Sequence, residues 1–217
     1  LLSLESSQAA ERRAMEARVL PREAELEALK AQLNPHFLFN ALNSVSALTT
    51  SAPARAREMC VLLSDFLRRS LSSGERPLIP LREELALARQ FLAVEKVRYG
   101  RRLDVEEDVD EEVLGSVVPP LLLQPLVENA VRHGVATLLD GGTVTLRVER
   151  TPDGVRVAVE NPFDPEAPAP AGSGLGLPLV RRRLAAAWGR AAELEERRGD
   201  GRFSVTLVVP AAPQVQA

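Results

Sequence analysis

Apolar residues recur at helical spacing through the first hundred residues of the chain. Residues 1–33 are otherwise polar and charged, and their thin apolar stripe predicts a dimeric coiled coil, interrupted at Pro21. The alternative is a single amphipathic helix packed on its own domain. Three further helices are predicted over residues 31–47, 54–71 and 81–99. The stripe consists of Met15, Val19, Leu26, Leu29 and Leu33.

After residue 101 the pattern changes to short alternating segments. Residues 143–149 and 155–159 alternate apolar and polar positions around a Pro-Asp-Gly turn, and this predicts a β-hairpin. A helix is predicted within residues 118–134, after a Pro-Pro pair, and another at 177–188. Other candidate strands lie at residues 103–105, 113–118, 192–196 and 203–209. The first half therefore reads as helical and the second half as α/β.

Composition excludes several classes of protein. The chain has 217 residues, 45% of them apolar, and a net charge of −3 from 27 basic and 30 acidic residues, so no basic nucleic-acid surface is expected. Its single cysteine excludes an intrachain disulfide, and the sequence contains no Cys/His cluster of the kind that binds structural zinc. No apolar run reaches the length of about 18 residues that a membrane helix needs. The chain begins at Leu1 rather than Met, so we expect it to be part of a longer protein.

The helix predicted around residue 36 has a polar stripe that contains a histidine. At about 100° per residue, the residues of this stripe fall within roughly 80° of one another around the helix axis, away from the apolar side. An exposed imidazole is substantially neutral at pH 7, so His36 has a ring nitrogen that can act as a nucleophile. On helix geometry alone, an ordinary surface histidine remains the alternative. The stripe is formed by Gln32, His36, Asn40 and Asn43.

Polar side chains also gather at the end of the apolar helix within residues 118–134. An Asn carbonyl oxygen is a suitable ligand for Mg²⁺, and Arg and His side chains can donate to phosphate oxygens. The glycine-rich segment 172–176 then opens a helix, where backbone N–H groups can approach phosphates. A plain polar helix end is the alternative to a site. The four residues are Glu128, Asn129, Arg132 and His133.

Together these segments resemble the LytS-type sensor histidine kinase family. Residues 33–43, with the sequence LNPHFLFNALN, are similar to the phosphoacceptor segment of that family. Residues 123–134, LQPLVENAVRHG, resemble its N box, and residues 172–177, GSGLGL, resemble its G box. Residues 95–99, EKVRY, resemble the segment that ends a helix in this family. The motifs follow one another in the expected order, and the resemblance covers roughly residues 25–209.

The resemblance implies an α + α/β protein with two folded parts. A dimeric helical bundle with an N-terminal coiled coil would precede an α/β sandwich ATP-binding domain of the gyrase, heat-shock-protein, histidine-kinase and MutL type. Residues 1–33 would be a coiled-coil signalling helix, 34–100 the dimerisation and histidine phosphotransfer helices, and 101–217 the catalytic ATP-binding domain. We expect a homodimer that acts on a response regulator, as the cytoplasmic portion of an inner-membrane-anchored receptor. No nucleic acid is expected as a partner. Contact with the membrane is expected only through segments absent from this chain.

The resemblance also implies an ATP-dependent protein histidine kinase with ATP and Mg²⁺ as cofactors. The γ-phosphate would pass to His36 and then to an aspartate of the response regulator. Asn129 would hold Mg²⁺, and Glu128 is the candidate general base. Asn40 matches, by spacing alone, a residue that is thought to orient water in some histidine kinases. The residues implied to contact the nucleotide are Asn129, Arg132, His133, Asn161, Gly172, Gly174, Leu175 and Gly176.

Three positions depart from related ATPases and kinases. Asn161 stands where an adenine-binding Asp is usual, although its side-chain oxygen can still accept a hydrogen bond. Pro125 stands where hydrolytic relatives carry a water-activating Glu, which disfavours simple hydrolysis of ATP. Phe37 follows His36, where many histidine kinases carry an acid. Two alternative functions stay open: an ATP-hydrolysing conformational switch of the same fold, and a dimeric scaffold that binds no nucleotide.

Overall fold

A computed structural model describes residues 35–73, 76–166 and 176–210 of the chain. The chain divides into two compact units, Leu1–Asn40 and Ala41–Ala217. The predicted coiled coil lies outside the described residues, and so do three of the predicted nucleotide contacts. These three are Gly172, Gly174 and Leu175.

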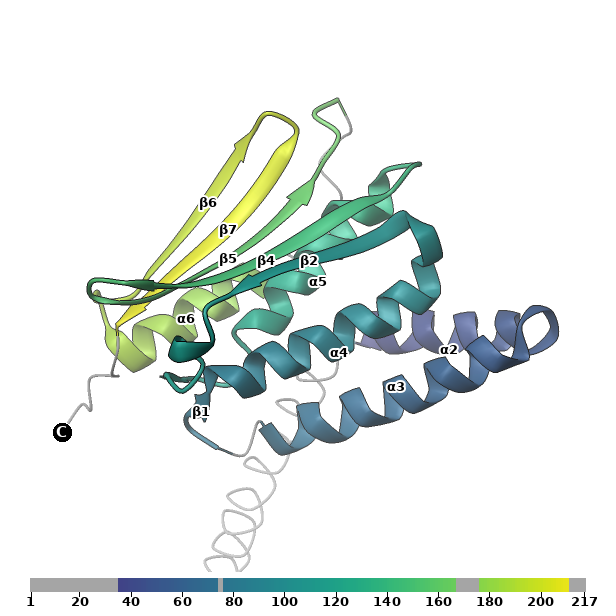
Figure 1. The fold of residues 1–217 in the computed structure, drawn as a ribbon, viewed down its shortest axis with the longest axis horizontal. Coiled ribbons are helices and arrows are strands. Elements are labelled where there is room, and N and C mark those ends of the chain that lie inside the picture. Colours follow the sequence, from purple (N-terminus) through teal and green to yellow (C-terminus); the bar gives the residue numbers. More distant parts are fainter. Residues whose placement is uncertain (1–34, 74–75, 167–175, 211–217) are drawn as a thin grey trace, which may run out of the picture. The chain divides into compact units, whose positions relative to one another are not determined.

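Three helices form the first half of the described chain, as the hydrophobic pattern predicts. They are α2 (Pro35–Ser51), α3 (Pro53–Ser73) and α4 (Leu81–Tyr99). Gly100 follows α4 with a φ of 62°, a conformation that favours glycine and ends the helix. Helices α3 and α4 lie side by side (Figure 1). Buried aromatic rings, whose centroids are 6.2 Å apart, pack between them: Phe66 and Phe91.

A five-stranded sheet forms the second half of the unit Ala41–Ala217. Its strand order is β2-β4-β5-β7-β6, with β2 parallel to β4 and every other neighbouring pair antiparallel. Strands β4 and β5 form the predicted hairpin, so that prediction is confirmed. The strands are β2 (Leu103–Val109), β4 (Gly142–Thr151), β5 (Gly154–Pro162), β6 (Glu193–Gly199) and β7 (Arg202–Pro210).

The segment between α4 and α5 differs from the pattern. Strand β2 continues through the acidic residues after position 105, up to Val109, because its backbone pairs with β4 along its whole length. Backbone hydrogen bonds do not depend on the side chain, so charged residues can remain in an edge strand and face solvent. The strand expected within residues 113–118 is only β3 (Val117–Val118), which pairs with the unpredicted β1 (Ile79–Pro80). Short 3₁₀ turns occupy Gly100–Arg102, Glu111–Val113 and Val135–Thr137.

Helices α4, α5 (Leu123–His133) and α6 (Gly176–Trp188) lie against one face of the sheet (Figure 1). On β5, every second residue from Val155 to Asn161 is buried, as expected for a strand with one covered face. Two of the three residues between them are charged: Arg156 pairs with Glu149 at 2.8 Å, and Glu160 pairs with Arg147 at 2.9 Å. The strand alternation therefore directs Asn161 to the face that the helices cover.

The described residues confirm the predicted α + α/β class. The boundary predicted at residue 100 remains a prediction, because α4 contacts α3 as well as α5 and β2. Dimerisation likewise stays a prediction at this point.

Candidate functional site

The predicted phosphoacceptor is exposed near the start of α2. Pro35 is the first helical residue, a position that tolerates proline because the first N–H groups of a helix have no partner within it. His36 is exposed, and the amide nitrogen of Asn40 lies 3.2 Å from its Nδ1 and 3.3 Å from its Nε2. The two side chains are one helical turn apart, as their spacing predicts. An amide there can donate to whichever ring nitrogen carries no proton.

Helix α5 carries the second group of predicted residues at positions that solvent can reach at least in part. Glu128, Asn129 and His133 are half-buried, and Arg132 is exposed. Gln124 donates from its Nε2 to Glu128 Oε1 at 2.8 Å, which fixes this carboxylate against its own helix. Partial burial, followed by the charge of Arg132, lowers the pKa of His133 and favours the neutral imidazole.

Asn161 approaches the C-terminal end of α5. It is 1% exposed, and its Nδ2 donates to the carbonyl of Pro162 at 2.9 Å. Gly134 follows α5, and a Cβ at this position would lie 2.3 Å from Asn161 Nδ2 and 2.7 Å from Pro162 O. Only glycine therefore lets the end of α5 come this close to β5. The residue expected at adenine thus lies beside the helix that carries Asn129.

The start of α6 lies beside α5 as well. A Cβ at Gly176, the first residue of α6, would be 3.6 Å from Pro125 Cβ, which is ordinary van der Waals contact. Pro125 precedes Asn129 by four residues, so the two lie one turn apart on the same side of α5. The described end of the glycine-rich segment is therefore next to the helix that carries the predicted Mg²⁺ ligand.

A buried acid of α4 faces α5. Glu95 is 1% exposed, and Arg98 donates from Nη1 to both of its carboxylate oxygens at 2.9 Å. Arg98 also donates from Nη2 to Tyr99 Oη at 2.7 Å. Burial raises the pKa of Glu95 to about 7; Arg98 acts against this rise, and the charge of Glu128 adds to it. The segment 95–99, which the sequence indicated only as a helix end, therefore contributes a buried carboxylate that is hydrogen-bonded to the half-buried Arg98 and is affected by the charge of the candidate base.

Sequence reasoning missed Glu84 and Arg183, which bind the turn leading into α5. Glu84 accepts hydrogen bonds from the backbone of residues 121–123, and Arg183 donates to the backbone carbonyls of the same turn. A signal for Glu84 was present, because it falls on the apolar face of α4 at helical spacing, and a carboxylate there usually has buried partners. Arg183 gave no such signal, because it is one of three consecutive arginines.

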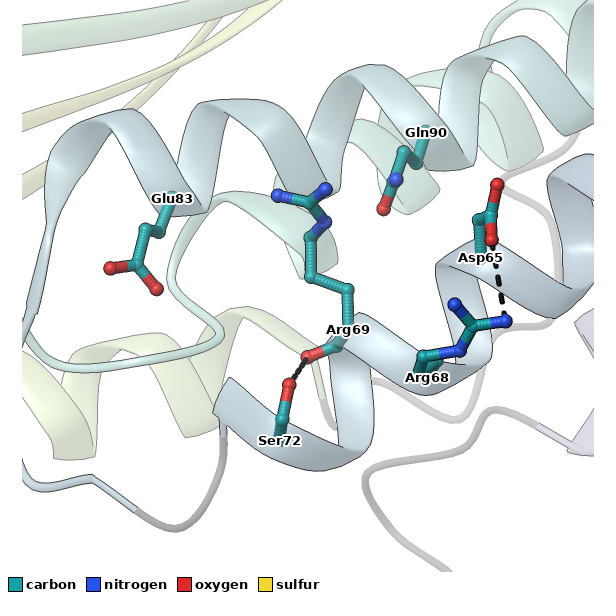
Figure 2. Close-up of a pocket in the computed structure, with 6 residues that line it drawn as sticks. All are labelled: Asp65, Arg68, Arg69, Ser72, Glu83 and Gln90. Atoms are coloured by element: carbon teal, nitrogen blue, oxygen red, sulfur yellow. Dashed lines mark hydrogen bonds and ion pairs between the residues drawn. The ribbon is translucent and has the colours of Figure 1, made fainter.

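A separate pocket lies between α3 and α4 (Figure 2). Its volume is about 420 Å³. Arg69 extends from α3 towards Glu83 and Gln90 of α4, and Arg68 pairs with Asp65 at 3.6 Å. None of the predicted site residues lines this pocket, whose acidic and basic side chains face one another. We therefore assign no part of the nucleotide site to it. The lining residues are Asp65, Arg68, Arg69, Ser72, Glu83 and Gln90.

The donor chemistry of α5 fits Mg²⁺. Asn129 offers an amide oxygen and the adjacent Glu128 a carboxylate, and Mg²⁺ commonly takes only one or two protein oxygens beside substrate phosphates. Within residues 35–73, 76–166 and 176–210, no cluster of three His, Cys, Asp or Glu side chains forms an all-protein metal site. In the same described ranges, no helix has both the length and the apolar character needed to cross a bilayer.

Two family models match the chain. The model described as "Histidine kinase" matches residues 24–103, which include His36 and Asn40. The model described as "Histidine kinase-, DNA gyrase B-, and HSP90-like ATPase" matches residues 120–213, which include α5, α6 and Asn161. The second match supports the use of ATP and agrees with helices covering one face of a mixed sheet.

Curated relatives are sensor kinases. Sensor histidine kinase YpdA of Escherichia coli (strain K12) is 36% identical over 207 residues, which are 91% of this chain and 36% of that protein. Sensor protein LytS of Staphylococcus saprophyticus is 31% identical over 203 residues, 88% of this chain and 34% of that protein. The chain thus spans about a third of the length of these relatives. With the phosphoacceptor segment, the N box and both family matches in order, the chain belongs to the LytS-type sensor histidine kinases.

Proposed function

We propose that this chain is the phosphoacceptor and ATP-binding portion of a two-component sensor, and that it transfers the γ-phosphoryl group of ATP to His36. The observation that carries the proposal is the exposed imidazole of His36, which has the Asn40 amide against its ring nitrogens within the histidine-kinase match. A neutral ring nitrogen of His36 would attack the γ-phosphorus while the bond to ADP breaks. Glu128 is the proposed general base, since it lies next to the proposed metal ligand on α5.

ATP would bind along the side of α5 that carries Asn129, Arg132 and His133. Asn129 would hold Mg²⁺, which neutralises charge on the phosphates when bound. Arg132 and His133 would donate to phosphate oxygens, and the backbone amides of the glycine-rich segment would add further donors. Asn161 would accept from the adenine amino group through Oδ1, because its Nδ2 already donates to the Pro162 carbonyl. Its burial at the end of α5 supports this role, although an uncharged amide binds adenine less strongly than the usual carboxylate.

The partners in this proposal are a second copy of the chain and a response regulator. Phe39 and Leu42 of α2 are 67% and 51% exposed, and such apolar side chains would be covered in a dimeric helical bundle. The phosphoryl group would then pass from His36 to an aspartate of the regulator. We also infer that the full-length protein is a membrane-anchored receptor, with this chain on the cytoplasmic side.

The test is incubation of the chain with γ-labelled ATP and Mg²⁺. Stable label that is lost in acid and kept in base identifies phosphohistidine. The chain has two histidines, and His36→Gln should abolish labelling while ATP binding persists. His133 is still present in this variant, so the loss of label would show that His133 is not the phosphoacceptor. Full labelling of His36→Gln would overturn the proposal. Phosphate release without label would favour a hydrolytic switch, and no ATP binding in a titration would favour a nucleotide-silent scaffold.

A further inference from the structure

The turn that precedes α5 is held from two sides by charged side chains, one buried and one half-buried. Leu121, in this turn, has a φ of 59°, a left-handed conformation that costs a non-glycine residue roughly 1–2 kcal/mol. Its neighbour Leu122 caps α5 without any side-chain hydrogen bond of its own. The turn therefore depends on groups from elsewhere in the fold to keep its shape.

Glu84 of α4 supplies the missing cap. Its side chain is fully buried, and its carboxylate accepts from the backbone N–H groups of Leu121, Leu122 and Leu123 at 2.6, 2.7 and 2.9 Å. These are N–H groups at the start of α5, which no residue within that helix can satisfy. A carboxylate at a helix N-terminus is also favoured by the helix dipole.

Arg183 of α6 holds the carbonyl side of the same turn. Its Nη1 donates to the carbonyl of Pro120 at 2.9 Å and to that of Leu121 at 2.6 Å. The guanidinium and the carboxylate of Glu84 attract each other, so each partly compensates the cost of burying the other. One turn is thus bound by α4 through its N–H groups and by α6 through its carbonyls.

We propose that Glu84 and Arg183 are positioning residues for the nucleotide site, because together they fix the start of α5 relative to α6. The inference rests on the proposed function, in which Asn129 on α5 and Gly176 at the start of α6 bind the same nucleotide. The contact distance between Gly176 and Pro125 places the start of α6 one turn from Asn129. If the turn relaxes, these two binding elements separate and each must be brought back when ATP binds.

The expected consequence is weaker ATP binding with little loss of maximal rate. Ordering the two helices would use part of the binding energy, whereas saturating ATP would itself hold them together. Loss of a charged hydrogen-bond donor commonly costs enough for a change of about tenfold in affinity. We therefore expect Arg183→Ala to raise the KM and the Kd for ATP·Mg²⁺ about tenfold, and kcat to change much less. Arg183→Lys, which keeps the charge and can donate to the same carbonyls, should recover most of the affinity.

The experiment measures autophosphorylation kinetics and ATP·Mg²⁺ titration on the whole chain. Arg182→Ala is the matched control, because Arg182 is the exposed neighbour on the same helix and should leave KM unchanged. An unchanged KM in Arg183→Ala, or a KM in Arg183→Lys as high as in Arg183→Ala, overturns the proposal. If Arg183→Ala does not fold, Glu84→Gln decides instead: a raised KM supports the proposal and an unchanged KM overturns it. If the wild-type protein binds no ATP, the proposed function itself is overturned. If the wild type binds ATP and Arg183→Ala binds it equally well, only this inference is overturned.

Discussion

Replacing Glu95 with glutamine should remove a large part of the pH dependence of folding stability. Burial raises the pKa of Glu95 from its usual value of 4.5 to about 7, against the effect of Arg98. The folded protein therefore binds this proton more tightly than the unfolded chain does. The resulting stabilisation is complete below about pH 4.5 and is lost as the pH rises through 7.

The size of the effect follows from the two pKa values. Their difference corresponds to about 3 kcal/mol, and roughly 2–3 kcal/mol of this lies between pH 5 and pH 8. Over that interval, the free energy of unfolding of the wild type should fall by this amount relative to Glu95→Gln. With a urea m-value of about 1–3 kcal/mol/M, the unfolding midpoints should diverge by about 1 M.

Tryptophan fluorescence gives a direct assay. Trp188 is the single tryptophan, and it is buried in α6, so its emission reports unfolding of the unit Ala41–Ala217. Urea titrations would be run at pH 5 and pH 8 on the wild type and on Glu95→Gln. Glu106→Gln, which changes an exposed glutamate of β2, is the control and should behave as the wild type does. Parallel pH profiles of the wild type and Glu95→Gln would refute the reasoning.

Three further changes test other parts of the site. Asn129→Ala should lower autophosphorylation by about a hundredfold, because it removes the proposed metal ligand, while the protein stays folded; a near-normal labelling rate would mean that the metal is held elsewhere. Asn40→Ala should leave labelling of His36 intact but slow the loss of phosphate from the response regulator, and equal decay with both proteins would make Asn40 a structural residue. Gly134→Ala should destabilise folding by about 1–3 kcal/mol in urea titrations, because its Cβ would lie 2.3 Å from Asn161 Nδ2; an unchanged midpoint would mean that this contact opens without cost.

Local patterns predicted much of the fold. The apolar spacing gave the bounds of α4, Leu81–Tyr99, because one helix face recurs every three to four residues and glycine ends it. Alternation around a Pro-Asp-Gly turn gave the hairpin of β4 and β5 for a similar reason. In the structure this alternation continues to Asn161, which is buried in register with Val155, Val157 and Val159. Each of these predictions depends only on neighbours along the chain.

Pairing between distant segments could not be predicted from the pattern of apolar and polar residues. The acidic residues of β2 after position 105 were not part of any predicted strand, and they form one because β4 pairs with their backbone. The two-residue strands β1 and β3 have no periodicity of their own and exist through their mutual pairing. In each case the stabilising partner lies tens of residues away along the chain, so no local signal records it.

The sequence by itself was enough to predict which residues would carry the chemistry, since the segments around His36 and Asn129 are continuous motifs whose residue types indicate what they can bind. Only the tertiary structure decided what holds these segments in place. Glu84, Glu95 and Arg183 matter because folding buries the two glutamates, half-buries the arginine and gives each a specific partner. A buried charge is stable only when its hydrogen bonds are satisfied. Glu84 and Arg183 find their partners in the turn at residues 120–123, which lies far from both of them along the chain.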